Sequence, residues 1–86
     1  MKPVRLSNHA QGHRASRGFS DEEVVTAIEQ KAWFPAIFGT GRFECEHEFP
    51  FESYWNGKWY GTKKVRPVFI EMEFEIVVVT VYTYYY

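Results

Sequence analysis

Cysteine is nearly absent from this sequence, which has one thiol, Cys45, in 86 residues. A single cysteine excludes an internal disulfide and any zinc site built from several thiolates. The chain also lacks a run of the roughly 18 apolar residues that a membrane helix requires, and residues 1–7 have no apolar signal-peptide core. These absences predict a protein of the reducing cytoplasm with no membrane partner.

No linker, repeat or low-complexity run interrupts the chain before the aromatic tail at residues 82–86. Hydrophobic residues make up 45% of the sequence, and they include 8 Phe, 6 Tyr and 3 Trp. This composition excludes a disordered segment and predicts one domain over residues 1–86. A domain this small gains little net stability from its core, so we expect the aromatics, or a partner subunit, to enlarge the buried area.

Charge is segregated although the net charge is only −1. Residues 1–19 and residues 58–66 each contain four Lys or Arg side chains and no acid, whereas residues 20–57 contain eight acids and two bases. If the fold brings the two basic segments together, a local anion-binding surface exists that the overall charge does not reveal.

Two helices are predicted in the first third of the chain. The first begins after Ser7, whose hydroxyl can cap the first turn, and ends at Gly18. The second begins at Ser20 with a capping box, places its acids at the positive end of the helix dipole, and runs to about Lys31. Its expected apolar stripe consists of Val24, Val25, Ile28 and Ala32.

Strand patterns follow a loop marked by Pro35 and the Gly39-Thr40-Gly41 run. Residues 42–49 alternate apolar and polar side chains, and Asn56-Gly57 between aromatic runs predicts a type I′ hairpin with Tyr54 facing Trp59. Strands at 65–69 and 76–82 flank an acidic turn at 71–75, and Pro67 predicts an edge or a bulge. The expected fold is α+β, with two N-terminal helices packed on one face of a three- to four-stranded antiparallel sheet.

The alternation of the last strand assigns its side chains to two faces. We expect Val77, Val79 and Val81 to lie under the helices. The opposite face then carries Ile76, Val78, Thr80 and Tyr82. Lys63 and Lys64 are adjacent and point to opposite faces, so only one of them can join Thr80 and Tyr82.

Four ordered segments resemble a bacterial family, the domain of unknown function 4258. They are Leu6-Ser7-Asn8-His9-Ala10, Arg17-Gly18-Phe19-Ser20-Asp21-Glu22-Glu23-Val24, Lys63-Lys64-Val65-Arg66-Pro67 and Val77-Val78-Val79-Thr80-Val81-Tyr82. That family is distantly similar to the ribonuclease-like superfamily of RelE toxins, barnase, EndoU and the colicin ribonucleases. The resemblance implies an open sheet face that cleaves RNA, and a cognate antitoxin as a partner.

The same resemblance nominates site residues. His9, Lys63, Thr80 and Tyr82 are the implied catalytic residues, and Arg14, Arg17 and Lys64 are the implied contacts to RNA phosphates. Metal-free cleavage needs a base for the 2′-hydroxyl proton, an acid for the leaving 5′-oxygen and cations around the phosphate, with a 2′,3′-cyclic phosphate and a 5′-hydroxyl as products. No metal and no cofactor are expected.

Each of these features has a second interpretation. His9 and His13 form an i, i+4 pair, but the helix lacks the further ligands of a metal site, and acidic neighbours disfavour a reactive thiolate at Cys45. The hairpin aromatics Tyr54, Trp55, Trp59 and Tyr60 suit base stacking or cross-strand packing. The alternative function is a non-catalytic interaction module or pseudoenzyme, which forms a homodimer through its aromatic surface.

Overall fold

The computed structural model describes residues 1–37 and 41–86, so Gly39 and Thr40 of the predicted loop lie outside the described residues. The described residues form an α+β fold with three helices and six strands. In chain order the elements are β1 (Val4–Leu6), α1 (Asn8–Gly12), α2 (Arg14–Arg17), α3 (Asp21–Gln30), β2 (Phe34–Pro35), β3 (Phe43–Glu44), β4 (His47–Trp55), β5 (Lys58–Glu71) and β6 (Ile76–Tyr85). The predicted α+β class is confirmed, but three helices follow β1 where two N-terminal helices were predicted.

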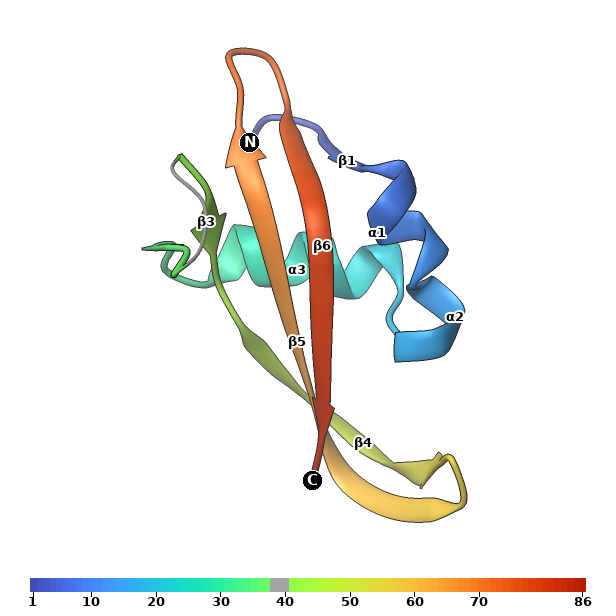
Figure 1. Cartoon of the computed structure of the whole chain (residues 1–86). Coiled ribbons are helices and arrows are strands. Elements are labelled where there is room, and N and C mark those ends of the chain that lie inside the picture. Colours follow the sequence, from blue (N-terminus) through green and yellow to red (C-terminus); the bar gives the residue numbers. More distant parts are fainter. Residues whose placement is uncertain (38–40) are drawn as a thin grey trace.

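The sheet is larger than expected and is mixed, so the prediction of three or four antiparallel strands is wrong in detail. Its order is β1-β6-β5-β3-β2, and β4 pairs with β5 on the same side as β3. β1 runs parallel to the first residues of β6. Figure 1 shows α3 crossing behind β5 and β6, with α1 and α2 beside β6, so one face of the sheet is covered and the other is open.

The predicted first helix is interrupted. The Ser7 side chain accepts a hydrogen bond from the Ala10 amide, and Gly18 ends the segment in the left-handed conformation, as expected. His13, however, separates α1 from α2 with φ of −97° and ψ of 2°. Gly12 has poor helix propensity, and the break at His13 directly after it redirects the chain across the edge of β6.

The second predicted helix, α3, has the expected capping box, in which Ser20 and Glu23 exchange side-chain and backbone hydrogen bonds. Its buried residues are Val24, Ala27 and Ile28. Val25 is only half-buried, and Ala32, beyond the helix end, is exposed. The predicted stripe was therefore wrong to include these two residues and to omit Ala27.

Pro67 lies inside β5, which runs continuously from Lys58 to Glu71 and has strands on both sides. Its carbonyl accepts the Cys45 amide at 3.4 Å, in the gap between β3 and β4. The N and C=O groups of a strand residue point to the same side, so the missing N–H of Pro67 faces a position where the neighbouring strand is interrupted. A central strand tolerates this proline because its partner there is broken. A bulge also lies next to it, between Val68 and Phe69, as the sequence predicted.

The face assignment of β6 was wrong for its first half. Val68 pairs with Thr80 but Phe69 pairs with Val78, so Val79 is an extra residue that shifts the alternation. Ile76 and Val78 are therefore buried under the helices, while Val77 and Val79 are not. Beyond the bulge, Val81 is buried and Thr80 and Tyr82 point to the open face, as expected.

The β4–β5 hairpin matches its prediction. Asn56 and Gly57 have φ of 51° and 82°, which a type I′ turn requires, and Tyr54 pairs with Trp59. The buried core lies between the helices and the covered face of the sheet. Its members include Phe19, Val24, Ile28, Val65, Phe69, Ile76, Val78 and Val81. No helix among residues 1–37 and 41–86 is long and apolar enough to cross a membrane.

Candidate functional site

Arg17, at the end of α2, reaches over the edge of β6 to the open face of the sheet. Its Nη1 atom donates to the Thr80 hydroxyl at 3.1 Å and to the Val81 carbonyl at 2.8 Å. Its guanidinium carbon lies 5.2 Å from the centre of the Tyr82 ring. The structure thus brings together three of the predicted site residues, Arg17, Thr80 and Tyr82, and no carboxylate in the described part of the chain is ion-paired with Arg17.

The backbone that carries Arg17 is held rigidly. The Arg17 carbonyl accepts hydrogen bonds from the hydroxyls of Thr83 at 2.6 Å and Tyr85 at 2.9 Å. Gly18 follows with φ of 73°, and a Cβ atom there would lie 2.6 Å from the Trp55 ring and would collide with the Tyr85 hydroxyl. A glycine is therefore required for both conformation and space.

Lys63 belongs to this support and not to the open face. It is only 8% exposed, and its ammonium donates to the Gly18 carbonyl at 2.9 Å and to the Glu23 carboxylate at 2.9 Å. The opposite parity of adjacent strand residues leaves Lys64 facing the open side, next to Tyr84 on β6. The sequence left open which lysine joins Thr80 and Tyr82. The structure identifies Lys64 and places Lys63 on the helix-covered face, where it fixes the end of α2.

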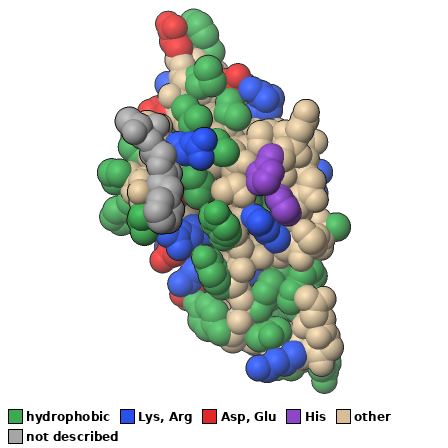
Figure 2. Space-filling model, viewed as in Figure 1, with side chains coloured by type: hydrophobic (Ala, Val, Ile, Leu, Met, Phe, Trp, Pro, Cys, Tyr) green, Lys and Arg blue, Asp and Glu red, His purple; other side chains and the backbone are tan. Residues whose placement is uncertain are grey.

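His9 and His13 lie side by side at the junction of α1 and α2, with ring centres 4.7 Å apart in an edge-to-face arrangement. Partial burial, followed by the nearby charges of Arg17 and His9, lowers the pKa of His13 below its ordinary value. This shift favours the neutral imidazole, which can accept a proton. Figure 2 shows histidine side chains on the viewed face, which is the open side of the sheet, next to a basic side chain.

Arg14, the alternative to Arg17, is engaged elsewhere. Its guanidinium makes two hydrogen bonds to the carboxylate of Asp21, at 2.9 and 3.1 Å, in an exposed pair. This pair neutralises Arg14 and joins α2 to the start of α3. Of the two arginines that the sequence nominated, Arg17 is the one that contacts Thr80.

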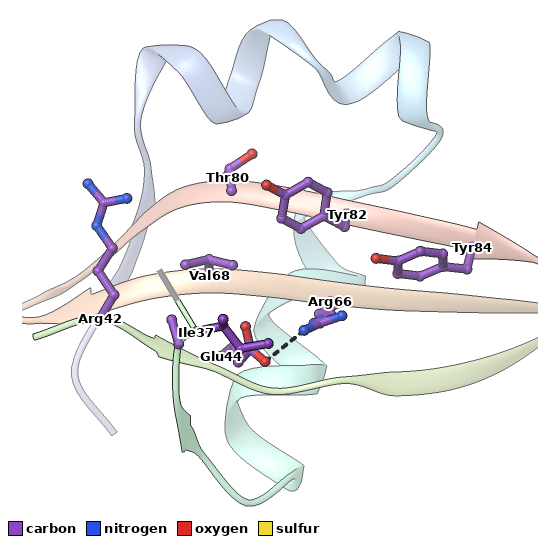
Figure 3. Close-up of a pocket in the computed structure, with 9 residues that line it drawn as sticks. Ile37, Arg42, Glu44, Arg66, Val68, Thr80, Tyr82 and Tyr84 are labelled. Carbon is purple, nitrogen blue, oxygen red and sulfur yellow. Dashed lines mark hydrogen bonds and ion pairs between the residues drawn. The ribbon is translucent and has the colours of Figure 1, made fainter. Parts of the chain in front are cut away.

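A cavity of about 270 Å³ opens on the exposed face beside Thr80. Figure 3 shows Thr80, Tyr82 and Tyr84 in a row along β6, with the side chain of Arg66 on β5 opposite them and that of Glu44 on β3 beyond it. Arg66 donates to Glu44 at 2.7 Å, and this hydrogen bond raises the pKa of the Arg66 guanidinium. The remaining wall is formed by Ala36, Ile37, Arg42 and Val68. The cavity thus offers aromatic surface, arginine donors and one carboxylate.

The hairpin aromatics make packing contacts with other rings. Tyr54 and Trp59 contact each other edge to face, with ring centres 5.5 Å apart. Trp55 stacks on Tyr85 at 4.9 Å, and Tyr60 lies 5.7 Å from the same ring. Trp55 therefore packs at Gly18, and Tyr60 contacts the same Tyr85 ring.

Four residues near the site were not predicted from the sequence: His13, Arg42, Arg66 and Tyr84. The signal for Tyr84 and Arg66 was present, because Tyr84 shares the parity of Tyr82, and Arg66 shares that of Lys64. Cys45 has no role there, since burial and the neighbouring Glu44 and Glu46 raise the pKa of its thiol to about 12.

Comparisons with protein-family models, with curated proteins and with solved structures give no match to this chain.

Proposed function

We propose that this protein binds single-stranded RNA on the open face of its sheet and cleaves it without a metal ion, as a RelE-like endoribonuclease. The observation that carries the proposal is the contact of Arg17 with Thr80 and Tyr82. The histidine pair adds to it, because the charge of the same arginine acts on His13. Phosphodiester cleavage through the 2′-hydroxyl uses the groups found here: two hydroxyls, two imidazoles and a guanidinium that is paired with no carboxylate of residues 1–37 and 41–86. The resemblance to the domain of unknown function 4258 family favours the same proposal.

The roles follow from charge and position. The neutral form of His13 takes the proton of the 2′-hydroxyl, and the resulting oxygen attacks the phosphorus. The bond to the 5′-oxygen breaks, and His9 supplies the proton that this oxygen needs to leave as a hydroxyl. Arg17 stabilises the negative charge that develops on the phosphate, and the hydroxyls of Thr80 and Tyr82 donate to its non-bridging oxygens. The products are a 2′,3′-cyclic phosphate and a 5′-hydroxyl.

The test uses purified protein with labelled single-stranded RNA in EDTA, with the His9→Ala, His13→Ala and Arg17→Ala variants. His47→Ala is the matched control, because the ring of His47 stacks on Phe49 at 4.4 Å and bonds the Glu48 carbonyl, apart from the site. We expect cyclic-phosphate products with the native protein and the control, and a loss of cleavage in the three site variants. Equal cleavage by His13→Ala and His47→Ala would contradict the assigned roles.

A toxin role in the cytoplasm extends the proposal. Expression of the protein should then arrest bacterial growth, and His13→Ala should relieve the arrest at equal protein level. A cognate antitoxin would cover the open face, so its co-expression should restore growth. Normal growth of cells that contain the folded native protein would contradict the toxin role.

One observation favours the alternative, a non-catalytic interaction module or homodimer. Tyr54 is 69% exposed and Trp59 is 53% exposed at the hairpin end. Exposed aromatics of this kind are enriched at protein interfaces. Sedimentation analysis of the native protein and of Trp59→Ser distinguishes the two: a dimer that dissociates in the variant, together with no RNA cleavage, would support the module.

A further inference from the structure

Three tyrosines form a continuous row on the open face. Tyr82, Tyr84 and Tyr86 occupy alternate positions, so their side chains leave the sheet on the same side. Their exposed fractions are 43%, 43% and 54%, and Tyr86 directly follows the end of β6. We call these three residues the tyrosine stripe.

Each member of the stripe has a cation beside it. Arg17 lies over Tyr82, and Arg66 on β5 pairs with Tyr82 across the ladder. Lys64 pairs with Tyr84, and its ammonium lies 5.8 Å from the centre of the Tyr86 ring. Aromatic faces next to a line of positive charges are the combination that single-stranded nucleic-acid sites use, since bases stack on the rings while phosphates contact the cations.

We propose that the tyrosine stripe is a stacking platform for three consecutive bases of a single strand, leading from the Thr80 end of the site to Tyr86. The position of the cut phosphate at Thr80 rests on the proposed function, whereas strand binding by the stripe does not. Alternate strand residues are about 6.6–6.8 Å apart, twice the 3.4 Å rise between stacked bases, so each tyrosine takes one base of an unstacked strand. Stacking of this kind tolerates any base, so the platform has little sequence preference.

A row of glutamates on the other side of the cations sets the strength of binding. Glu44 is ion-paired with Arg66 at 2.7 Å, Glu46 lies 3.9 Å from Lys64, and Glu48 accepts a hydrogen bond from the Tyr86 hydroxyl. Phosphates must compete with Glu44 for Arg66 and with Glu46 for Lys64. Loss of a carboxylate therefore strengthens binding, an outcome that a purely structural role of the glutamates would not give.

The experiment measures fluorescence anisotropy of labelled single-stranded DNA, which lacks the 2′-hydroxyl and cannot be cleaved by the proposed route. Oligothymidylates of two to six nucleotides serve as probes at low salt. We expect affinity to rise up to about three or four nucleotides and then to level. Tyr84→Ala should weaken binding at least about fivefold, from the usual stacking contribution of one base, while Tyr84→Phe retains it. Glu46→Gln should bind more tightly than the native protein.

Tyr54→Ala is the matched control, because Tyr54 is exposed at the hairpin end, away from the stripe. Equal binding by the Tyr84→Ala and Tyr54→Ala variants, or weaker binding by Glu46→Gln, would overturn the platform. RNA cleavage that survives in Tyr84→Ala with unchanged DNA binding would leave the proposed function intact and reject the stripe. DNA binding through the stripe without any RNA cleavage would support the stripe and reject the proposed function.

Discussion

Arg17 donates a hydrogen bond to the hydroxyl of Thr80 across 3.1 Å, although the two residues are 63 positions apart in sequence. The contact joins the first basic segment of the chain to the last strand. It also carries a positive charge from the edge of the sheet to its open face, where Tyr82 and the cavity lie. The proposed activity depends on this placement.

Replacement of Arg17 tests the charge at the cut phosphate. Arg17→Ala should lower kcat about 100-fold, a typical loss when one donor to the transition-state oxygens is removed. Arg17→Lys should recover only part of the rate, because an ammonium lacks the planar fork of donors. Single-turnover cleavage measures both. Arg14→Ala, in which an exposed ion pair with Asp21 is lost, is the control and should keep the native rate.

The pH dependence of cleavage tests the role of His13. Partial burial and the charges of Arg17 and His9 lower its pKa, so the neutral, proton-accepting form is present from below the ordinary histidine value of about 6.5 upward. The midpoint of the acid limb of the rate should therefore lie below pH 6.5. Arg17→Gln removes one cause of the shift, so this acid limb should move to higher pH. A rate that falls as pH decreases from 8 to 7 would contradict the assignment.

Lys63 should act as a positioning residue through its bond to the Gly18 carbonyl and its ion pair with Glu23. Lys63→Met leaves the mostly buried Glu23 carboxylate without its partner and should lower the free energy of unfolding by about 3 kcal/mol. Urea denaturation of Lys63→Met, Glu23→Gln and the double variant measures this. The double variant should lose less stability than the sum of the two single variants, because both single changes break the same Lys63–Glu23 ion pair.

Cleavage separates positioning from direct contact. If Lys63 is a positioning residue, Lys63→Met should mainly lower kcat. Lys63→Arg, which keeps the charge, should then recover more of kcat than of KM relative to Lys63→Met. A direct phosphate contact would instead make the main loss in Lys63→Met a rise in KM at unchanged fold stability.

Gly18 should not tolerate a side chain. Gly18→Ala requires a left-handed residue whose Cβ lies 2.6 Å from Trp55, so we expect a loss of at least about 2 kcal/mol in stability. Gly12→Ala is the matched control, since nothing lies within 4 Å of its Cβ position and alanine favours the helix. Gly12→Ala should leave the free energy of unfolding unchanged or raise it by up to about 1 kcal/mol. Thermal unfolding of both variants gives the comparison, and equal melting temperatures would contradict the account of Gly18.

Cys45 should be inert in the native protein. Burial raises the pKa of its thiol to about 12, so almost no thiolate exists near neutral pH. A disulfide reagent should label Cys45 rapidly in denaturant and slowly in buffer. Fast labelling of the folded protein at pH 8 would mean that the strand around Cys45 opens readily.

Local signals in the sequence predicted the elements that depend on neighbouring residues. The Ser20 capping box, the left-handed Gly18 and the Asn56-Gly57 turn all formed as expected, because each is fixed within a few residues. The first helix was harder to predict, since its break at His13 places α2 against the edge of β6, which is distant in sequence.

Features that depend on strand pairing could not be read from one strand alone. The bulge at Val79 exists only relative to the register of β5, and it reversed the faces of Ile76 and Val78 while leaving Thr80 and Tyr82 as predicted. Lys63 and Lys64 were indistinguishable until the partner residues Tyr84 and Tyr85 fixed their sides. β1 escaped prediction because it has only three residues and its partner is β6.

The most direct measurement compares one RNA with the same strand that carries a single 2′-deoxynucleotide at the cleaved position, in EDTA and with the native protein. Cleavage through the 2′-hydroxyl predicts a 2′,3′-cyclic phosphate and a 5′-hydroxyl from the first strand, and no cut at the modified position in the second. Cleavage of both strands at that position, or an intact RNA after incubation with folded protein, would contradict the proposed activity.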